Sequence, residues 1–198
     1  QSQVDKTSIT SVAVAKNYLY INDTFMKEMV ILDITNPKVP IKTASFKSPD
    51  IPYVWGIKTS GNYAFLNGIS PNIVIVDISD PASPIQAGIF NYGTHAPVWY
   101  QVRDNFIYLS NFSHLAQIIG CHFKIYDISS PKETKLVGQY TVANDDFPIS
   151  SIFFAWEYAF CCHGGHGVRI IDVADPANPK EIGIFNTASK SVGVSIKD

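Results

Sequence analysis

Hydrophobic residues in this chain form short runs that alternate with polar positions, and the same order of runs occurs four times. The most regular run is apolar, ends in an aspartate and leads into a proline-containing turn, and residues 73–81 read IVIVDISDP. The corresponding aspartates are 44, 50 and 45 residues apart, at Asp33, Asp77, Asp127 and Asp172. A repeat of this length is typical of propellers and solenoids.

Each copy predicts four strands, because its runs are four to six residues long, rich in aromatic and β-branched residues, and separated by turn residues. No helical period interrupts them. The first and second strands are predicted at 11–15 and 18–21, 54–58 and 63–66, 98–102 and 106–109, and 151–155 and 158–161. The third and fourth strands are predicted at 29–34 and 41–46, 73–78 and 85–90, 123–128 and 135–140, and 168–173 and 180–185.

The turns have a repeated chemistry. Asn or Gly between the first two strands tolerates the positive φ of a tight hairpin, whereas the fourth copy has Trp156 and Glu157 there. The aspartate after the third strand is expected to accept hydrogen bonds from amides of the next turn, where proline stops the strand. One position of the fourth strand is small in every copy, which predicts that a neighbouring sheet packs close to Ala44, Gly88, Gly138 and Gly183.

This pattern predicts an all-β β-propeller built of four-stranded antiparallel blades. The blades are expected at about 8–50, 51–96, 97–148 and 149–190, within a single domain covering 1–198. Residues 191–198 resemble the first strand of a blade and predict the start of a fifth one. We therefore expect four complete blades from a larger propeller, with a closed four-bladed ring as the alternative.

Two runs carry a resemblance to a known family. Residues 73–81, and residues 61–65 with the sequence GNYAF, resemble the LVIVD repeat. Proteins of that family are predominantly cell-surface or secreted proteins of bacteria and archaea. The resemblance implies a propeller and a location outside the cell or at its surface, but neither an activity nor a cofactor.

Composition excludes some classes of function. Charged residues make up 16% of the chain, the net charge is −2, and the lysines and arginines are scattered, so a nucleic-acid binder is not expected. No apolar run is long enough to span a membrane. Three cysteines do not form a disulfide framework. Two glycosylation sequons begin at Asn22 and Asn111.

Propeller topology places the connections of each blade at two ends. The turn end carries the connections between strands one and two and between strands three and four, and the loop end carries the remaining, more variable connections. Because variable loops on a rigid scaffold carry function, we predict a non-enzymatic scaffold that binds a protein or surface ligand at the loop end. The candidate binding residues are Tyr53, Trp55, His95, Trp99, Phe112 and His114.

The alternative is a metal-binding protein or enzyme with its site at the same end. Thiolate and imidazole are preferred zinc ligands, and the candidate ligands are Cys121, His122, Cys162, His163 and His166. No catalytic residue is predicted, because the chain lacks a nucleophile elbow. The four repeated aspartates are interpreted as structural. A third hypothesis is that open blade edges pair with another chain.

Overall fold

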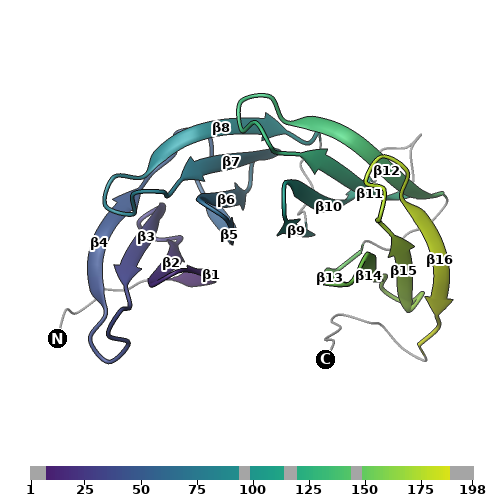
Figure 1. The fold of residues 1–198 in the computed structure, drawn as a ribbon, viewed down its shortest axis with the longest axis horizontal. Coiled ribbons are helices and arrows are strands. Elements are labelled where there is room, and N and C mark those ends of the chain that lie inside the picture. Colours follow the sequence, from purple (N-terminus) through teal and green to yellow (C-terminus); the bar gives the residue numbers. More distant parts are fainter. Residues whose placement is uncertain (1–7, 94–98, 114–119, 144–148, 188–198) are drawn as a thin grey trace. The chain divides into compact units, whose positions relative to one another are not determined.

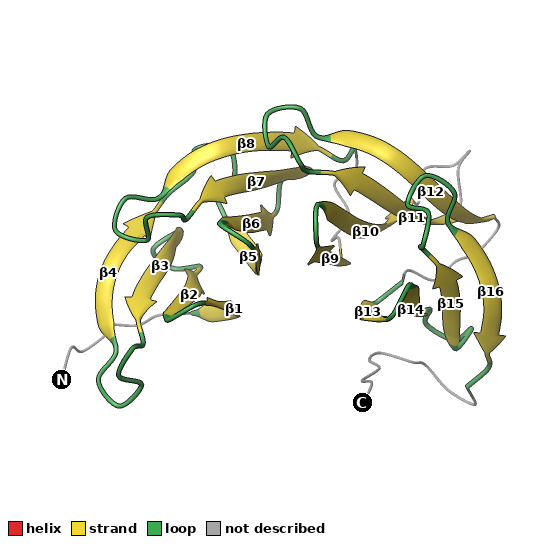
Figure 2. Ribbon diagram, in the orientation of Figure 1, coloured by secondary structure: helices red, strands yellow, loops and turns green. Residues whose placement is uncertain are grey.

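The computed structural model describes residues 8–93, 99–113, 120–143 and 149–187, with the backbone alone at 111–113, 120–121 and 143. These residues form sixteen strands in four antiparallel four-stranded sheets. Figure 2 shows strands and loops there and no helix, which confirms the predicted all-β class. Accordingly, none of the described residues belongs to a helix able to cross a membrane.

The order of strands within every sheet follows the order along the chain (Figure 1). The first sheet contains β1 (Ile9–Ala15), β2 (Tyr18–Asp23), β3 (Glu28–Asp33) and β4 (Ile41–Phe46). The second contains β5 (Val54–Ser60), β6 (Tyr63–Gly68), β7 (Asn72–Asp77) and β8 (Ile85–Asn91). The third contains β9 (Trp99–Arg103), β10 (Phe106–Ser113), β11 (Gly120–Asp127) and β12 (Lys135–Ala143), and the fourth β13 (Ser151–Ala155), β14 (Tyr158–Cys162), β15 (Val168–Asp172) and β16 (Lys180–Phe185).

The chain divides into two compact units. The first unit comprises residues 1–95 with 131–133 and holds β1 to β8, whereas the second comprises 96–130 with 134–198 and holds β9 to β16. Each unit therefore contains two sheets of the predicted blade type. The single domain over 1–198 stays a prediction, and the predicted fifth blade at 191–198 lies outside the described residues.

Each unit has its core between its two sheets. In the first unit, Tyr20 and Met29 of one sheet pack in a buried cluster with Ile57 and Leu66 of the other. In the second unit, Tyr108 and Phe123 share a buried cluster with side chains of the fourth sheet, among them Ile152, Ala159, Cys161 and Ile171. Burying the apolar face of one sheet against the next is the packing that stacked blades require.

The first turn of every sheet has the same geometry, with one correction to the sequence prediction. The positive φ falls on the first residue of the turn, one position before the asparagine where that residue is present. The fourth sheet does not depart from the others, because Ala155 pairs with Tyr158 across Trp156 and Glu157. The residues at positive φ are Lys16 (53°), Gly61 (54°), Asp104 (54°) and Trp156 (51°).

The repeated aspartates cap the turns that follow the third strands, as predicted. The Oδ1 atom of each accepts a hydrogen bond from the amide two residues later, at 2.7–2.9 Å. For Asp77, bonds from the backbone and side chain of Ser79 hold the pKa below its usual value. The next residue, Ile78, donates its amide to the Asn62 carbonyl at 2.8 Å, which fastens β7 to the first turn of its sheet. These aspartates are structural.

The small position of the fourth strand lies beside a β-bulge that the sequence analysis did not anticipate. In every sheet the register of the third and fourth strands shifts by one residue next to this position. A Cβ atom on Gly138 would overlap the Pro176 carbonyl, and one on Gly88 the Pro131 carbonyl, which confirms the close approach there. At Gly183 the nearest described atom is Ile170 Cδ1, at 3.8 Å, so none of the described residues makes this close approach there.

Candidate functional site

The loop end of the first unit carries a group of exposed aromatic and apolar side chains. Their exposed fractions are 67% for Phe25, 47% for Met26, 40% for Tyr53 and 40% for Trp55. The ammonium of Lys27 lies 4.4 Å from the centre of the Tyr53 ring, which joins the β2–β3 loop to the segment entering β5. We call these five residues the loop-end patch. It includes two predicted binding residues, Tyr53 and Trp55.

Buried polar groups hold the β2–β3 loop in place. Asp23 is buried, and its Oδ1 atom accepts the amides of Phe25 and Met26, each at 3.0 Å. Lys27 closes the loop at a φ of 56°, a conformation that costs a residue with a side chain about 1–2 kcal/mol. The loop is therefore a fixed platform for Phe25 and Met26.

The segment entering β5 is anchored as well. The Asn22 side chain donates hydrogen bonds to the Val54 carbonyl and to Thr10, and Thr10 in turn donates to the Trp55 carbonyl at 3.1 Å. A Cβ atom on Gly68 would overlap the Tyr53 carbonyl, so glycine allows this segment to pack close. Asn22 is fully buried, which means that the folded protein does not present the first sequon for glycosylation.

The loop end of the second unit is built differently, around a buried polar network. His163 is fully buried, and its Nδ1 atom accepts a hydrogen bond from Arg169 Nε at 2.8 Å. Arg169 Nη1 pairs with Glu181 Oε2 at 2.6 Å, and the Tyr140 hydroxyl donates to the same oxygen at 2.7 Å. Burial, and then Glu181, raise the pKa of Tyr140 to about 12.

This network includes His163, one of the predicted metal ligands. His163 Nδ1 already accepts a hydrogen bond from Arg169, so its lone pair is not available to a metal ion while this bond is made. His166 is exposed, and its ring centre lies 5.5 Å from that of His163. His122 lies beside the Thr141 hydroxyl at 3.1 Å, and burial followed by the charge of Lys124 lowers its pKa. Within the part of the chain that the structure describes, no three His, Cys, Asp or Glu residues gather around one point. The side chain of Cys121 is not among those described, so the zinc site stays a prediction.

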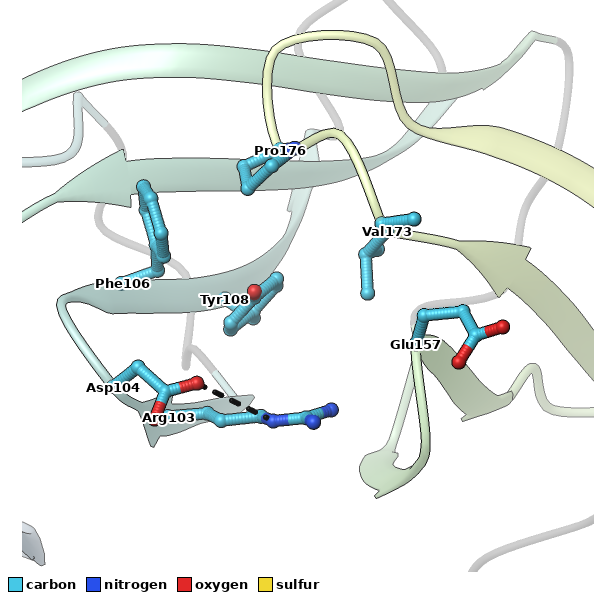
Figure 3. Close-up of a pocket in the computed structure, with 8 residues that line it drawn as sticks. Arg103, Asp104, Phe106, Tyr108, Glu157, Val173 and Pro176 are labelled. Atoms are coloured by element: carbon cyan, nitrogen blue, oxygen red, sulfur yellow. Dashed lines mark ion pairs between the residues drawn. The ribbon is translucent and has the colours of Figure 1, made fainter.

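The turn end of the second unit contains a cavity of about 330 Å³ (Figure 3). Phe106 and Tyr108 of β10 form its apolar wall together with residues of the turn after β15. Figure 3 shows Glu157 across the cavity from Asp104, with the Arg103 side chain extending toward Glu157 and Tyr108 above it. The cavity is lined by Arg103, Asp104, Phe106, Tyr108, Glu157, Val173, Ala174 and Pro176.

Arg103 organises the charges around this cavity. Its Nε atom lies 3.6 Å from Asp104 Oδ2, and its Nη1 atom donates to the Trp156 carbonyl. The guanidinium also lies over the Phe154 ring, 5.6 Å from the ring centre. Burial raises the pKa of Tyr108, while Arg103 lowers it and Asp104 raises it, so the phenol stays protonated at neutral pH.

The corresponding turns of the first unit are joined directly. There Lys16 Nζ donates to Asn62 Oδ1 at 3.2 Å. In the second unit the same two positions are the acidic residues Asp104 and Glu157. There Arg103 joins the two turns instead, through its bond to the Trp156 carbonyl, and both acidic residues line the cavity.

The other predicted binding residues have different outcomes. Trp99 is exposed at the start of β9, in the second unit, whereas Tyr53 and Trp55 belong to the first. His95 and His114 lie outside the described residues, and of Phe112 only the backbone, in β10, is described. The described residues therefore do not show the six predicted binding residues in one site, and they do not exclude such a site.

Sequence analysis missed Phe25, Met26 and the lining of the cavity. A signal for the first two was present, because large apolar residues at the tip of a loop between Asp23 and Glu28 have no core to enter. The signal for the cavity was Glu157, a lining residue that takes the place of the asparagine in the other three first turns. Neither pattern specifies that the side chains come together.

Solved structures resemble this chain in fold. The computationally designed Ika8 protein is 11% identical, with a TM-score of 0.69, over 96% of this chain and 53% of its own. BamB from Moraxella catarrhalis is 12% identical, with a TM-score of 0.62, over 94% and 55%. A chain of a nidogen/laminin complex is 13% identical, with a TM-score of 0.58, over 91% and 66%. This chain thus spans between 53% and 66% of the length of these structures.

Such low identities show the fold alone, which is that of β-propeller blades. No curated protein matches the sequence. The profile of the LVIVD repeat matches residues 8–47, 52–92 and 154–187, which correspond to the first, second and fourth sheets and make up more than half of the chain. The third sheet, with its longer β10 and β11, lies between the matched segments. The chain belongs to the LVIVD repeat family.

Proposed function

We propose that this chain is a binding scaffold whose propeller blades present the loop-end patch to a protein partner. The observation that carries the proposal is the exposure of Phe25, Met26, Tyr53 and Trp55 at one end of one unit. Aromatic residues and methionine are enriched where proteins bind each other, and large aromatic side chains provide most hot spots.

The anchoring of the patch supports this function. A surface that is already ordered loses less conformational entropy on binding than a mobile loop does. Asp23 orders Phe25 and Met26, while Asn22 and Gly68 fix the segment of Tyr53 and Trp55. Apolar side chains are also exposed elsewhere on strands, such as Ile41 and Ile85 at the starts of fourth strands. The patch differs from these because Phe25 and Met26 lie on an anchored loop.

Propeller folds in other proteins occur in protein assemblies. The nidogen/laminin structure is a complex of that kind, and its propeller-like chain resembles this one in fold. By analogy we propose a protein as the occupant of the patch, and a location outside the cell or at its surface. Protease treatment of intact source cells tests the location, since an external protein is digested while cytoplasmic markers survive.

The test of binding compares immobilised chains that differ only at the patch. Wild-type protein and a Phe25→Asp/Trp55→Asp variant are exposed to surface and extracellular proteins of the source cells. The variant is expected to lose the retained partner, because two apolar contacts are replaced by desolvated charges. The affinity for the partner, once identified, is expected to fall at least about 100-fold, which corresponds to a loss of about 1.4 kcal/mol at each of the two residues.

Val39→Asp provides the matched control. Val39 is also exposed, but it lies in the turn after β3, at the turn end. The control is expected to retain the same partner as the wild type. If the patch variant retains that partner with unchanged affinity, or if the control loses it equally, the proposal is wrong.

A further inference from the structure

The cavity of the second unit combines hydrogen-bond donors and acceptors around one small space. Arg103 and the protonated Tyr108 hydroxyl can donate, while the carboxylates of Asp104 and Glu157 can accept. Because cationic and anionic groups both line the cavity, a ligand with a full charge of either sign meets a like charge. A neutral ligand that carries several hydroxyl groups, each both donor and acceptor, meets complementary partners on both sides.

Tyr108 gives the cavity a specific polar contact. The residue is only 4% exposed, and its ring is held against Phe154 at 4.6 Å and Phe123 at 6.1 Å between ring centres. Its hydroxyl makes no hydrogen bond to the described residues. The hydroxyl is not one of the buried polar atoms that lack a partner, so it is accessible from the cavity, where a ligand can both accept from it and donate to it.

Trp156 is an exposed aromatic residue in the turn that contributes Glu157 to the cavity. It immediately precedes the lining residue Glu157, is 72% exposed, and has a φ of 51° where the first unit has Gly61. An indole is an unfavourable residue for a left-handed backbone, and strained residues of this kind cluster at functional sites. The donated bond from Arg103 to its carbonyl fixes this turn against the third sheet.

We propose that this cavity binds a neutral polyhydroxyl ligand, namely one sugar ring of a glycan. Hydroxyl groups of the ring bond to Tyr108, Arg103 and the two carboxylates, and an apolar C–H face packs on Trp156. The volume of about 330 Å³ lies at the lower end of small-molecule sites and suits a single ring. This site is separate from the loop-end patch and does not depend on it.

The experiment titrates the full isotope-labelled chain with glucose, galactose, mannose and N-acetylglucosamine in turn. Acetate and ethylamine serve as the anionic and cationic probes. Binding is followed by the amide shifts of Asp104, Glu157 and Ala174, which line the cavity. At least one sugar is expected to shift these signals saturably, with a dissociation constant in the millimolar range, while acetate and ethylamine do not.

Three variants decide whether the cavity is responsible. Tyr108→Phe keeps the ring packing and removes the hydroxyl, and Trp156→Asn keeps the turn and removes the indole. Each is expected to weaken sugar binding about fivefold or more, the loss of one hydrogen bond or stacking contact. Tyr20→Phe removes the corresponding phenol of the first unit and is expected to change nothing.

The inference is overturned if none of the sugars shifts the three amides, if acetate or ethylamine does so instead, or if the sugar affinity survives Tyr108→Phe and Trp156→Asn unchanged. Circular dichroism checks that each variant is folded. Glu157→Gln, which keeps the size of an exposed side chain, provides a further test should Tyr108→Phe unfold, and is expected to weaken the same binding.

Discussion

The two units share the same backbone features and differ in the side chains at the two ends of their sheets. Both have four-stranded sheets, a left-handed residue in each first turn, an aspartate cap after each third strand and a bulge beside the small residue. At the loop end, the first unit exposes Phe25 and Trp55, whereas the second buries His163 and Arg169. At the turn end, Lys16 joins Asn62 in the first unit, while Glu157 lies across a cavity from Asp104 in the second.

This difference shows which positions the repeat constrains. Residues that close turns or separate sheets recur in every copy, because each copy needs the same backbone. Residues at the ends of the second strands and at the first positions of the first turns differ between copies, and the second position is Asn in every copy but the fourth, which has Glu157. These differences determine the chemistry of each end. The repeat thus fixes the scaffold, and the departures from it are the candidates for function.

The largest expected loss of stability comes from a substitution that disrupts the packing of sheets in the second unit. In Gly138→Val, the side chain overlaps the Pro176 carbonyl, so the variant is expected to lose about 3 kcal/mol or more of unfolding free energy, or to misfold. Gly183→Val is the matched control at the same position of the next sheet, where the nearest described atom leaves room. Urea unfolding measures both, and equal destabilisation would contradict this explanation of the small residue.

A second prediction compares the buried ion pair of one unit with the exposed pairs of the other. Arg169→Met leaves Glu181 without its cation and is expected to cost about 3 kcal/mol. Lys42→Met in the first unit removes an exposed lysine 3.4 Å from Glu28, which also lies 3.8 Å from Lys47, and is expected to cost less than about 1 kcal/mol. Thermal unfolding measures the loss of stability in both variants. A larger loss for Lys42→Met than for Arg169→Met would contradict the prediction.

The aspartate caps are expected to contribute equally in both units. Asp77→Ala and Asp127→Ala each remove a cap of the same geometry, and each is expected to cost about 1 kcal/mol. Because hydrogen bonds lower the folded pKa of both carboxyls, their contribution is fully present above the unfolded value near 3.9 and is lost as the pH falls below it. A melting-temperature series from pH 6 to pH 3 measures this, and a flatter low-pH slope is expected for either variant.

The smallest effect has the opposite sign. Asn tolerates the left-handed conformation better than Trp, so Trp156→Asn is expected to stabilise the folded chain by about 0.5–1 kcal/mol. Gly61→Trp at the matched turn of the first unit is expected to destabilise it by a similar amount. Both are measured by urea unfolding, and a destabilising Trp156→Asn would show that the indole contributes contacts that outweigh the backbone strain.

The sequence predicted all sixteen strands to within a few residues because hydrophobic alternation and turn residues are local signals. Asp77 and its equivalents were predicted as caps for the same reason. The bulge beside Gly138 could not be predicted, since it depends on how the third and fourth strands pair. The cavity was missed because Arg103, Tyr108 and Glu157 come together only when two sheets pack, and no local pattern records that packing.

A protein partner is expected to bind at the loop-end patch, and hydrogen–deuterium exchange of the chain with and without its partner tests this directly. Protection is expected at residues 23–28 and 51–56, the segments that form the loop-end patch. The turns at 33–40 and 77–84, at the opposite end of the same sheets, are expected to exchange as they do in the free chain. Protection confined to those turns, or to the fourth strands, would contradict the assignment of the patch as the binding surface.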